Sequence, residues 1–338
     1  MIDSPVVVDE LRRTYVLRKG RLSRTTRTVE ALKGISFEVR RGELFGLVGP
    51  NGAGKTTTIR ILTTLLVPTG GTARVLGLDV ARDAKRIRTR IGILFGGERG
   101  LYGRVSAWQN LRYFANLYGL PTNRSSRRID EVLAITGLSD RAGDRVDTFS
   151  RGMKQRLHIA RALLHEPELI FLDEPTVGLD PIAAREIREL IRRLRAAGTT
   201  ILLSTHYMLE ADELCDRVGI IDRGRLLALA APDVLRDEAP DLFVVEVELL
   251  GEPAAWMLDR VRALAGPDGV ISADQRADRH VLRIQSRHGR ELVDELPEAL
   301  REASIGAVVL REPTLEDVYV RMIGNARQQD SIGELVQV

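Results

Sequence analysis

Apolar and polar residues follow two different patterns along this chain, and the pattern changes near residue 235. Before that point, short apolar runs alternate with stretches whose apolar residues recur at helical spacing, which is typical of an α/β domain. Runs such as Leu-Ile-Phe-Leu at Leu169–Leu172 are apolar throughout, as expected for strands buried on both faces of a sheet. The predicted strands are Val6–Leu11, Ile35–Val39, Leu44–Val48, Arg90–Leu94, Leu169–Leu172, Thr200–Ser204 and Arg217–Ile221.

A more helical stretch, at about residues 98–165, interrupts this alternation. Its apolar residues recur at helical spacing in Trp108–Leu117, Ser126–Thr136 and Met153–Leu164. We therefore expect residues 1–235 to form one α/β domain into which a helical subdomain is inserted.

The remaining chain shows the alternation of a smaller mixed domain. A charged segment with a proline at each end, Pro232–Pro240, predicts a linker, placed at residues 236–240. The order of elements after it is strand, helix, strand, strand, helix, strand and a last helix, which predicts a ferredoxin-like βαββαβ domain over residues 241–325 and a frayed tail at 326–338. The elements are Leu242–Leu250, Pro253–Ala265, Gly269–Ala273, His280–Gln285, Glu291–Glu302, Ile305–Arg311 and Leu315–Ile323.

Composition excludes several classes of protein. Of the 338 residues, 44% are hydrophobic and 29% charged, which excludes a disordered chain. The formal net charge of +3 gives little support to nucleic-acid binding. The apolar runs are shorter than the roughly 20 residues that a spanning helix needs. Cys215 is the one cysteine, so an intrachain disulfide is excluded, which fits a reducing cytosol.

A glycine-rich run follows the predicted strand Leu44–Val48 and precedes a helical pattern at Thr57–Leu66. It reads Gly49-Pro50-Asn51-Gly52-Ala53-Gly54-Lys55-Thr56 and matches the phosphate-binding pattern G-x-x-x-x-G-K-[ST]. In such a loop, backbone N–H groups and the helix N-terminus surround the phosphates. We expect Lys55 to reach the β- and γ-phosphates and the hydroxyl of Thr56 to bind Mg²⁺. Thr57, the next residue, is also expected to contact the nucleotide.

Two acidic residues, Asp173 and Glu174, stand directly after the apolar run Leu169–Leu172. Asp173 would hold Mg²⁺, directly or through water. Glu174 would act one residue later as the general base for the attacking water. Alone, such a pair could equally be a helix cap or a solvated turn, and the phosphate loop upstream favours the nucleotide site.

Further motifs make the chain similar to the ATP-binding cassette (ABC) ATPases. Phe149-Ser150-Arg151-Gly152-Met153-Lys154-Gln155-Arg156 resembles the signature motif of that family, about twenty residues before Asp173. Val177-Gly178-Leu179-Asp180-Pro181 resembles its D-loop, and His206 its switch histidine. Tyr15 lies where the family has an aromatic residue that stacks on adenine. The motifs occur in the family's order and cover residues 1 to about 235.

The resemblance implies ATP and Mg²⁺ as cofactors, ATP hydrolysis and a head-to-tail homodimer. In the family, the signature of one subunit faces the phosphate loop of the other, so Ser150, Gly152 and Asp180 would meet the nucleotide bound by a second copy. Lys55, Glu174 and His206 would form the catalytic group, with His206 holding the water and Glu174 in register. His206 could instead be a packed histidine at a strand end.

This sequence departs from the family in two places. Arg151 replaces the first of two glycines that usually follow the signature serine; it would pair with phosphate or a partner carboxylate, or have no role. The loop before the helical region has no glutamine, and Gly97 or Glu98 aligns with that position. Glu98 is therefore a substitute candidate for a contact with Mg²⁺ or water.

The branch of the family follows from Ser-Arg-Gly-Met-Lys-Gln-Arg at Ser150–Arg156, from Gly100–Arg104 and from Pro313–Tyr319. These resemble the type-2 exporters, the drug, antibiotic and sodium efflux ATPases. The resemblance implies separate integral-membrane permease subunits, touched by Leu101–Asn110. It also implies a cytoplasmic location, peripheral on the inner face of the cell membrane. The alternatives are a soluble ABC ATPase with a non-transport role and an importer ATPase.

A basic segment interrupts the first predicted hairpin. Residues 12–27 carry seven arginines and lysines and no acid. One interpretation is binding to an anionic membrane surface or to an acidic loop of the permease. The other is a solvated hairpin without a partner.

Overall fold

The structure is a computed structural model that describes residues 4–18, 26–95, 100–237, 242–267, 269–276 and 279–323. The chain divides into two compact units, Met1–Ala231 and Pro232–Val338, and each is described by itself. The segment predicted as a linker begins with α8 (Pro232–Asp237), in which Leu235 is buried. Residues 236–237 of the predicted linker are therefore helical, and its remainder lies outside the described residues.

A six-stranded sheet carries the first unit, in the order β10-β9-β3-β8-β7-β6. All neighbours from β9 to β6 are parallel, and β10 pairs antiparallel with β9. The strands are β3 (Leu44–Val48), β6 (Ile91–Leu94), β7 (Leu169–Asp173), β8 (Thr200–Thr205), β9 (Arg217–Asp222) and β10 (Arg225–Ala230). The five parallel strands agree with the predictions within one residue at either end, and β10 was missed. Because the strands are parallel, β3, β7 and β8 end at the same edge.

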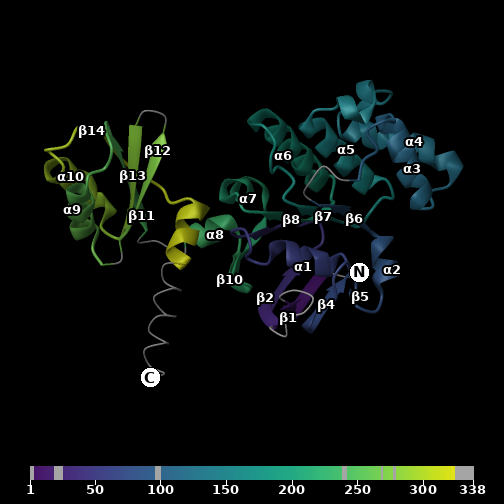
Figure 1. The fold of residues 1–338 in the computed structure, drawn as a ribbon, viewed down its shortest axis with the longest axis horizontal. Coiled ribbons are helices and arrows are strands. Elements are labelled where there is room, and N and C mark those ends of the chain that lie inside the picture. Colours follow the sequence, from purple (N-terminus) through teal and green to yellow (C-terminus); the bar gives the residue numbers. More distant parts are fainter. Residues whose placement is uncertain are drawn as a thin grey trace. The chain divides into compact units, whose positions relative to one another are not determined.

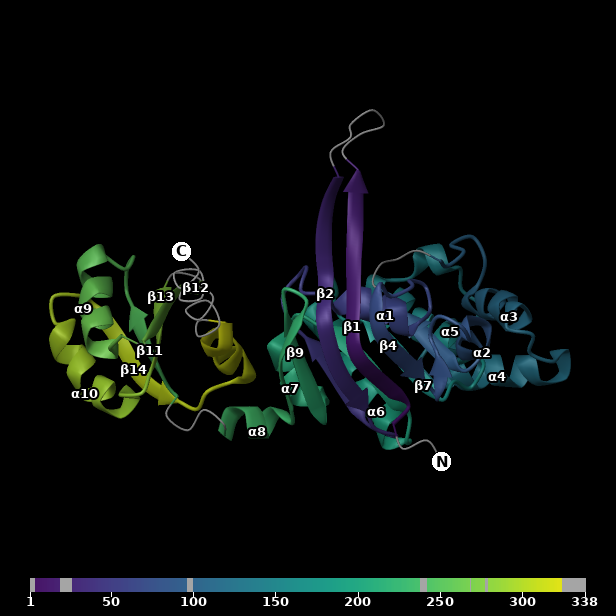
Figure 2. The same ribbon diagram turned by 90° about the horizontal axis from the view of Figure 1, so that it is seen from below.

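A second sheet is antiparallel, in the order β2-β1-β4-β5, with β4 (Gly70–Val75) and β5 (Leu78–Asp79) not predicted. Its first strands, β1 (Val6–Arg18) and β2 (Thr26–Val39), are longer than predicted and pair as far as Arg18 and Thr26. The basic segment was therefore wrongly treated as an interruption: its threonine, valine and tyrosine residues favour strands despite the charges. Figure 2 shows this hairpin reaching far beyond the rest of its sheet.

Helices flank these sheets. Figure 1 shows α3 (Ala107–Leu117), α4 (Thr122–Ile135) and α5 (Arg151–Leu163) gathered beside the β6 end of the large sheet. A capping box formed by Ser106 and Gln109 begins α3. The other helices of this unit are α1 (Lys55–Leu62), α2 (Ala84–Arg88), α6 (Pro181–Ala196) and α7 (Met208–Leu214), with short 3₁₀ turns at Ser139–Arg141 and Val146–Thr148.

The second unit has the predicted order of elements after α8. Its antiparallel sheet has the strand order β12-β13-β11-β14. The elements are β11 (Phe243–Leu249), α9 (Ala255–Ala265), β12 (Val270–Arg276), β13 (Arg279–Ser286), α10 (Gly289–Ala299), β14 (Ile305–Arg311) and a helix over residues 315–323. Side chains from one face of the sheet, among them Val245 and Leu282, pack with residues of α9 and α10 into a core of its own.

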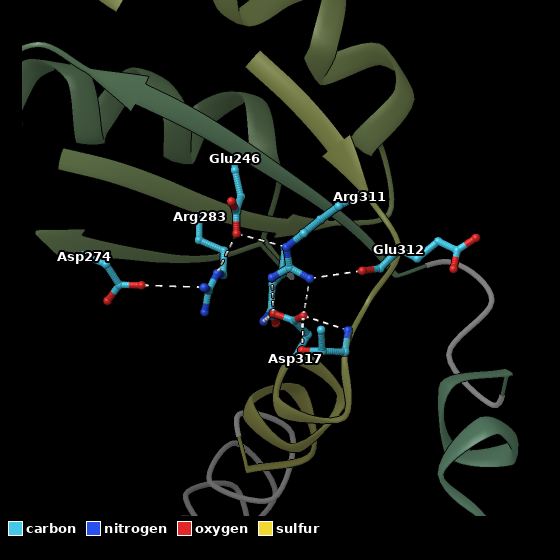
Figure 3. A network of polar contacts seen from close by, with 8 residues as sticks. Glu246, Asp274, Arg283, Arg311, Glu312 and Asp317 are labelled. Carbon is cyan, nitrogen blue, oxygen red and sulfur yellow. Dashed lines mark hydrogen bonds and ion pairs between the residues drawn. The ribbon is translucent and has the colours of Figure 1, made fainter. Parts of the chain in front are cut away.

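Charged side chains cross this sheet from strand to strand (Figure 3). Arg283 lies between Asp274 and Glu246, and Glu246 also accepts a hydrogen bond from Arg311 Nε (2.9 Å). Arg311 in turn donates to both carboxylate oxygens of Asp317, at 2.6 and 3.1 Å. The network therefore fixes the helix over residues 315–323 to the sheet and gives Pro313–Tyr319 a structural role.

Candidate nucleotide-binding site

The loop between β3 and α1 surrounds the side chain of Lys55. Lys55 Nζ donates hydrogen bonds to the carbonyl oxygens of Gly49 (2.7 Å) and Pro50 (3.1 Å). Two glycines are required for this path: Gly54 has a φ of +117°, and a Cβ on Gly49 would lie 2.0 Å from the carbonyl oxygen of Ile221. The predicted strand, loop and helix are thus observed in the order that presents backbone N–H groups to a phosphate.

The middle of the loop has one exposed and one anchored part. Asn51 and Gly52 are exposed at its turn, and Gly52 has a φ of +83°. Ala53 is buried, donates its N–H to the Pro50 carbonyl (3.2 Å) and accepts from the N–H of Gly224. The anchored part fixes the loop to the core, and the exposed part is open to a ligand.

Lys55 is a buried cation that faces carboxylates. Its side chain is 3% exposed, and its Nζ lies 3.4 Å from Glu174 Oε1. Burial lowers the pKa of the Lys55 ammonium, and the negative charges of Glu174 and Asp173 partly oppose this effect. A buried ammonium in this position is suited to additional negative charge such as that of a phosphate.

Asp173, at the end of β7, meets two hydroxyl groups. Ser204 Oγ and Thr56 Oγ1 both donate to Asp173 Oδ1, at 2.5 and 3.2 Å. Burial raises the pKa of Asp173, although these two hydrogen bonds act against the increase. A hydroxyl and a carboxylate brought together in this way are oxygen donors of the type that Mg²⁺ prefers, so Thr56 and Asp173 fit the predicted ion.

Glu174 lies at the meeting point of β7 and β8. Its backbone has a φ of +51°, which is unusual for a residue with a side chain, and its N–H is held by the carbonyl (3.0 Å) and the hydroxyl (3.2 Å) of Ser204. His206 follows the end of β8, and its Nδ1 lies 3.3 Å from Glu174 Oε1. The structure therefore brings the predicted catalytic residues together: Lys55, Glu174 and His206 contact one another through the carboxylate.

Tyr15 lies next to the first turn of α1. Its hydroxyl is 3.5 Å from Thr57 Oγ1, and the Arg13 guanidinium lies over its ring at 4.8 Å from the ring centre. The aromatic ring predicted to stack on adenine is thus beside the residue that follows the phosphate loop.

The residues of the signature and D-loop form a separate group around the beginnings of α5 and α6. Ser150 caps α5 and accepts from Met153 N (3.2 Å), while Asp180 caps α6 through two backbone N–H groups. A Cβ on Gly152 would lie 2.7 Å from the Cβ of Ala183, so this glycine permits close packing of the two helices. Arg151 reaches the Gly178 carbonyl at 3.5 Å. None of these contacts involves a residue of the phosphate loop.

A cleft opens beside Asp173 and Glu174, and four of its lining residues were not predicted as site residues. These are Gln155, Arg60, Phe95 and Val177. Gln155 Nε2 donates to the Pro175 carbonyl at 2.6 Å and so joins α5 to the segment after Glu174. Arg60 stands four residues after Thr56 on α1, and this helical spacing was the available signal. Glu98, the substitute candidate, lies outside the described residues, as do the side chains at positions 17–27 of the basic segment.

The comparisons with known proteins agree with this geometry. The family described as ABC transporter matches residues 32–177. The chain is 38% identical over 334 residues to a daunorubicin resistance ATP-binding protein of Streptomyces coeruleorubidus, covering 97% of this chain and 98% of the relative. It is 40% identical over 313 residues to a fluoroquinolones export ATP-binding protein of Mycobacterium tuberculosis, covering 92% of this chain and 94% of the relative.

Solved structures agree as well. The chain matches part of an ABC transporter complex from Clostridium perfringens, cbiO1, at a TM-score of 0.61 and 30% identity, over 71% of this chain and 93% of the other. It matches the ATP-binding cassette MJ0796, a dimer in a post-hydrolysis state with ADP and Pi, at a TM-score of 0.58 and 25% identity, over 67% of this chain and 98% of the other.

Proposed function

Because the chain belongs to the ABC transporter ATPases and is an ATP-hydrolysing exporter subunit, we propose that the cleft between the phosphate loop and β7 is its Mg-ATP site. The observation that carries the proposal is the convergence of Lys55, Thr56, Asp173 and Glu174 at one edge of the sheet. Lys55 would neutralise the β- and γ-phosphates. Thr56 and Asp173 would hold Mg²⁺, which neutralises the charge that develops on the phosphoryl oxygens.

Glu174 is placed to act as the general base. Its fixed backbone, bonded twice to Ser204, aims the carboxylate at the space that it shares with Lys55 and His206. From there it takes the proton of the attacking water. His206 keeps the carboxylate in position, and Tyr15 stacks on the adenine.

The signature group serves a second copy of the chain. Ser150, Gly152 and Asp180 bond and pack among α5 and α6 rather than with their own phosphate loop. The N-terminus of α5, a helix of 13 residues, offers positive potential to the γ-phosphate held by the partner. Arg151 adds a positive charge at the same place. Closure of the homodimer around ATP then couples hydrolysis to transport.

A separate membrane permease is the proposed partner of the helical subdomain. Tyr102, Val105, Tyr113 and Leu117 are exposed there, and Tyr102 and Tyr113 make an edge-to-face contact with ring centres 4.9 Å apart. Exposed aromatic residues gathered in this way are typical of interaction sites. In the described part of the chain, no helix is long and apolar enough to cross a membrane. Docking to such a permease would place this subunit in the cytoplasm, on the inner face of the cell membrane.

The names of the relatives favour a drug or antibiotic as the transported compound, since they are called daunorubicin resistance and fluoroquinolones export proteins. The strand order β12-β13-β11-β14 supports assigning the second unit to the ferredoxin-like class as its accessory domain. The basic hairpin is a candidate for the anionic membrane surface. Its described cations Arg12 and Arg13 are bound to Glu10 and to the Val67 carbonyl, so this role rests on the remaining ones.

Glu174→Gln tests the proposed site. We expect this variant to bind Mg-ATP and to accumulate as an ATP-bound dimer, while turnover falls about a hundredfold or more, because the amide cannot accept the proton of water. Turnover is measured by phosphate release and dimer formation by light scattering. Glu189→Gln, an exposed glutamate of α6, is the matched control. A monomeric Glu174→Gln with normal turnover would contradict the proposal.

A further inference from the structure

The imidazole of His206 is held by few polar contacts. Its Nδ1 is buried and lies 3.3 Å from Glu174 Oε1, but within the described residues this nitrogen makes no hydrogen bond of good geometry. A histidine side chain rotates about two single bonds, and in most buried side chains a hydrogen bond restricts such rotation. The plane of the His206 ring therefore depends on what packs against it.

The next residue, Tyr207, provides that packing. Its ring lies against the imidazole, with the two ring centres 4.1 Å apart and the two planes inclined by 37°. Successive side chains of a strand point in opposite directions, so this contact depends on the turn between β8 and α7. The Tyr207 side chain is still about half exposed, so one of its faces covers the imidazole while much of the ring meets solvent.

Hydrogen bonds on both sides fix the backbone of Tyr207. Its N–H donates to Thr205 Oγ1 (3.0 Å), and its carbonyl accepts from the N–H groups of Glu210 (3.1 Å) and Ala211 (3.3 Å) in α7. Thr205 is the last residue of β8 and is fully buried. The ring is thus presented from a backbone that is bound to a buried strand end and to a helix.

We propose that Tyr207 is a positioning residue for ATP hydrolysis, whose ring restricts the imidazole of His206 to the orientation in which Nδ1 faces Glu174. The proposal rests on the roles given above to Glu174 and His206. Tyr207 acts through His206, since it is not among the residues that line the cleft beside Glu174. Its hydroxyl makes no hydrogen bond within the described residues, so the aromatic ring is the part that acts.

Two substitutions at this position test the proposal. Tyr207→Leu keeps an apolar side chain and removes the aromatic face, whereas Tyr207→Phe keeps the ring. In the full-length chain we expect Tyr207→Leu to lower the single-turnover rate of ATP hydrolysis about fivefold, or about 1 kcal/mol in activation free energy, with the Kd for ATP changed less than about twofold. Tyr207→Phe should retain the native rate. Loss of rate in both variants would show that the ring contact is not what acts.

Tyr118→Leu is the matched control. Tyr118 makes a similar contact with His165, with ring centres 4.4 Å apart and planes inclined by 35°, in the helical region. Its replacement should lower the unfolding temperature by about as much as Tyr207→Leu does, while leaving the rate of hydrolysis unchanged. If the two leucine variants lower the rate equally, the effect comes from a general loss of packing and Tyr207 has no positioning role.

A double-mutant cycle separates this proposal from the one on which it rests. His206→Ala alone should lower single-turnover hydrolysis strongly, and Tyr207→Leu should change the rate less than about twofold in that background, because its effect passes through the imidazole. If His206→Ala is silent, the role of His206 and that of Tyr207 are both wrong. If His206→Ala lowers the rate but Tyr207→Leu does not, or if Tyr207→Leu keeps its full effect without the imidazole, only the positioning role of Tyr207 is wrong.

Discussion

Each unit of the molecule buries an aspartate among hydrogen-bond donors, and the donors are distributed differently. In the second unit, Asp317 is 1% exposed and accepts five hydrogen bonds over both oxygens, from Gln285, Arg311 and Thr314. In the first unit, the two hydroxyl donors of Asp173 both meet Oδ1.

The two pKa values move in opposite directions as a result. For Asp317, burial alone would raise the pKa, but the hydrogen bonds from Arg311 and Thr314 outweigh it and lower the pKa. For Asp173, the effect of burial is larger than that of the hydrogen bonds from Ser204 and Thr56, and the pKa is raised. A saturated carboxylate stabilises the fold, whereas an incompletely satisfied one keeps capacity for a ligand at the expense of stability.

Two matched substitutions, Asp173→Asn and Asp317→Asn, test this difference. Asp173→Asn should have the larger effect, and its effect is on turnover. The amide oxygen can still accept from Thr56 and Ser204, so we expect thermal stability at neutral pH to be retained or increased. Mg²⁺-dependent turnover should fall about a thousandfold, or about 4 kcal/mol in activation free energy, because a charged ligand is lost. Phosphate release and differential scanning fluorimetry measure the two effects. Turnover within tenfold of the native value would remove Asp173 from the metal site.

Asp317→Asn should show the reverse pattern. An amide nitrogen in place of Oδ2 would face the Arg311 guanidinium and the Thr314 donors, and a broken buried pair costs about 3–5 kcal/mol. We expect the second unit to unfold at a lower temperature while turnover per folded molecule stays native. Asp259→Asn, on the exposed face of α9, is the control. An unchanged unfolding profile would show that the network of Figure 3 contributes little.

The regions of the molecule also differ in how much of their structure can be predicted from the sequence. The phosphate loop and Asp173 could be predicted because motif and strand pattern coincide in a short stretch. Gln155 could not, because its significance depends on Pro175, which is distant in sequence and is brought close only by the fold. Likewise, β4 and β5 lack an apolar run: β4 is defined by its pairing with β1, and β5 by its pairing with β4.

The pH dependence of stability sharpens the comparison further. Because the folded pKa of Asp317 is lowered, its stabilisation is present above the ordinary value of 3.8 and is lost as the pH falls through the folded pKa. Because that of Asp173 is raised, the cost of its charge appears only as the pH rises above 3.8. On acidification, any gain in Asp173→Asn should disappear, and the loss in Asp317→Asn should begin to shrink below pH 3.8. Thermal melts of both variants and the native chain from pH 7 to pH 3 test this, and differences that stay constant would refute it.

The smallest expected effect concerns Gly152 of the signature group. There, the packing of α5 against α6, rather than charge, determines which side chain fits. In Gly152→Ala, the new methyl group would lie 2.7 Å from the Cβ of Ala183, so α5 and α6 must move apart at a cost of about 1–3 kcal/mol. Adding Ala183→Gly removes the obstructing atom and should restore the unfolding temperature. If turnover also recovers in the double variant, Gly152 serves only to pack α5 against α6. If stability recovers and turnover does not, the methyl group obstructs the γ-phosphate of the partner, as the proposed dimer requires. Failure of Ala183→Gly to restore stability would show that the contact with α6 is not what excludes a side chain at position 152.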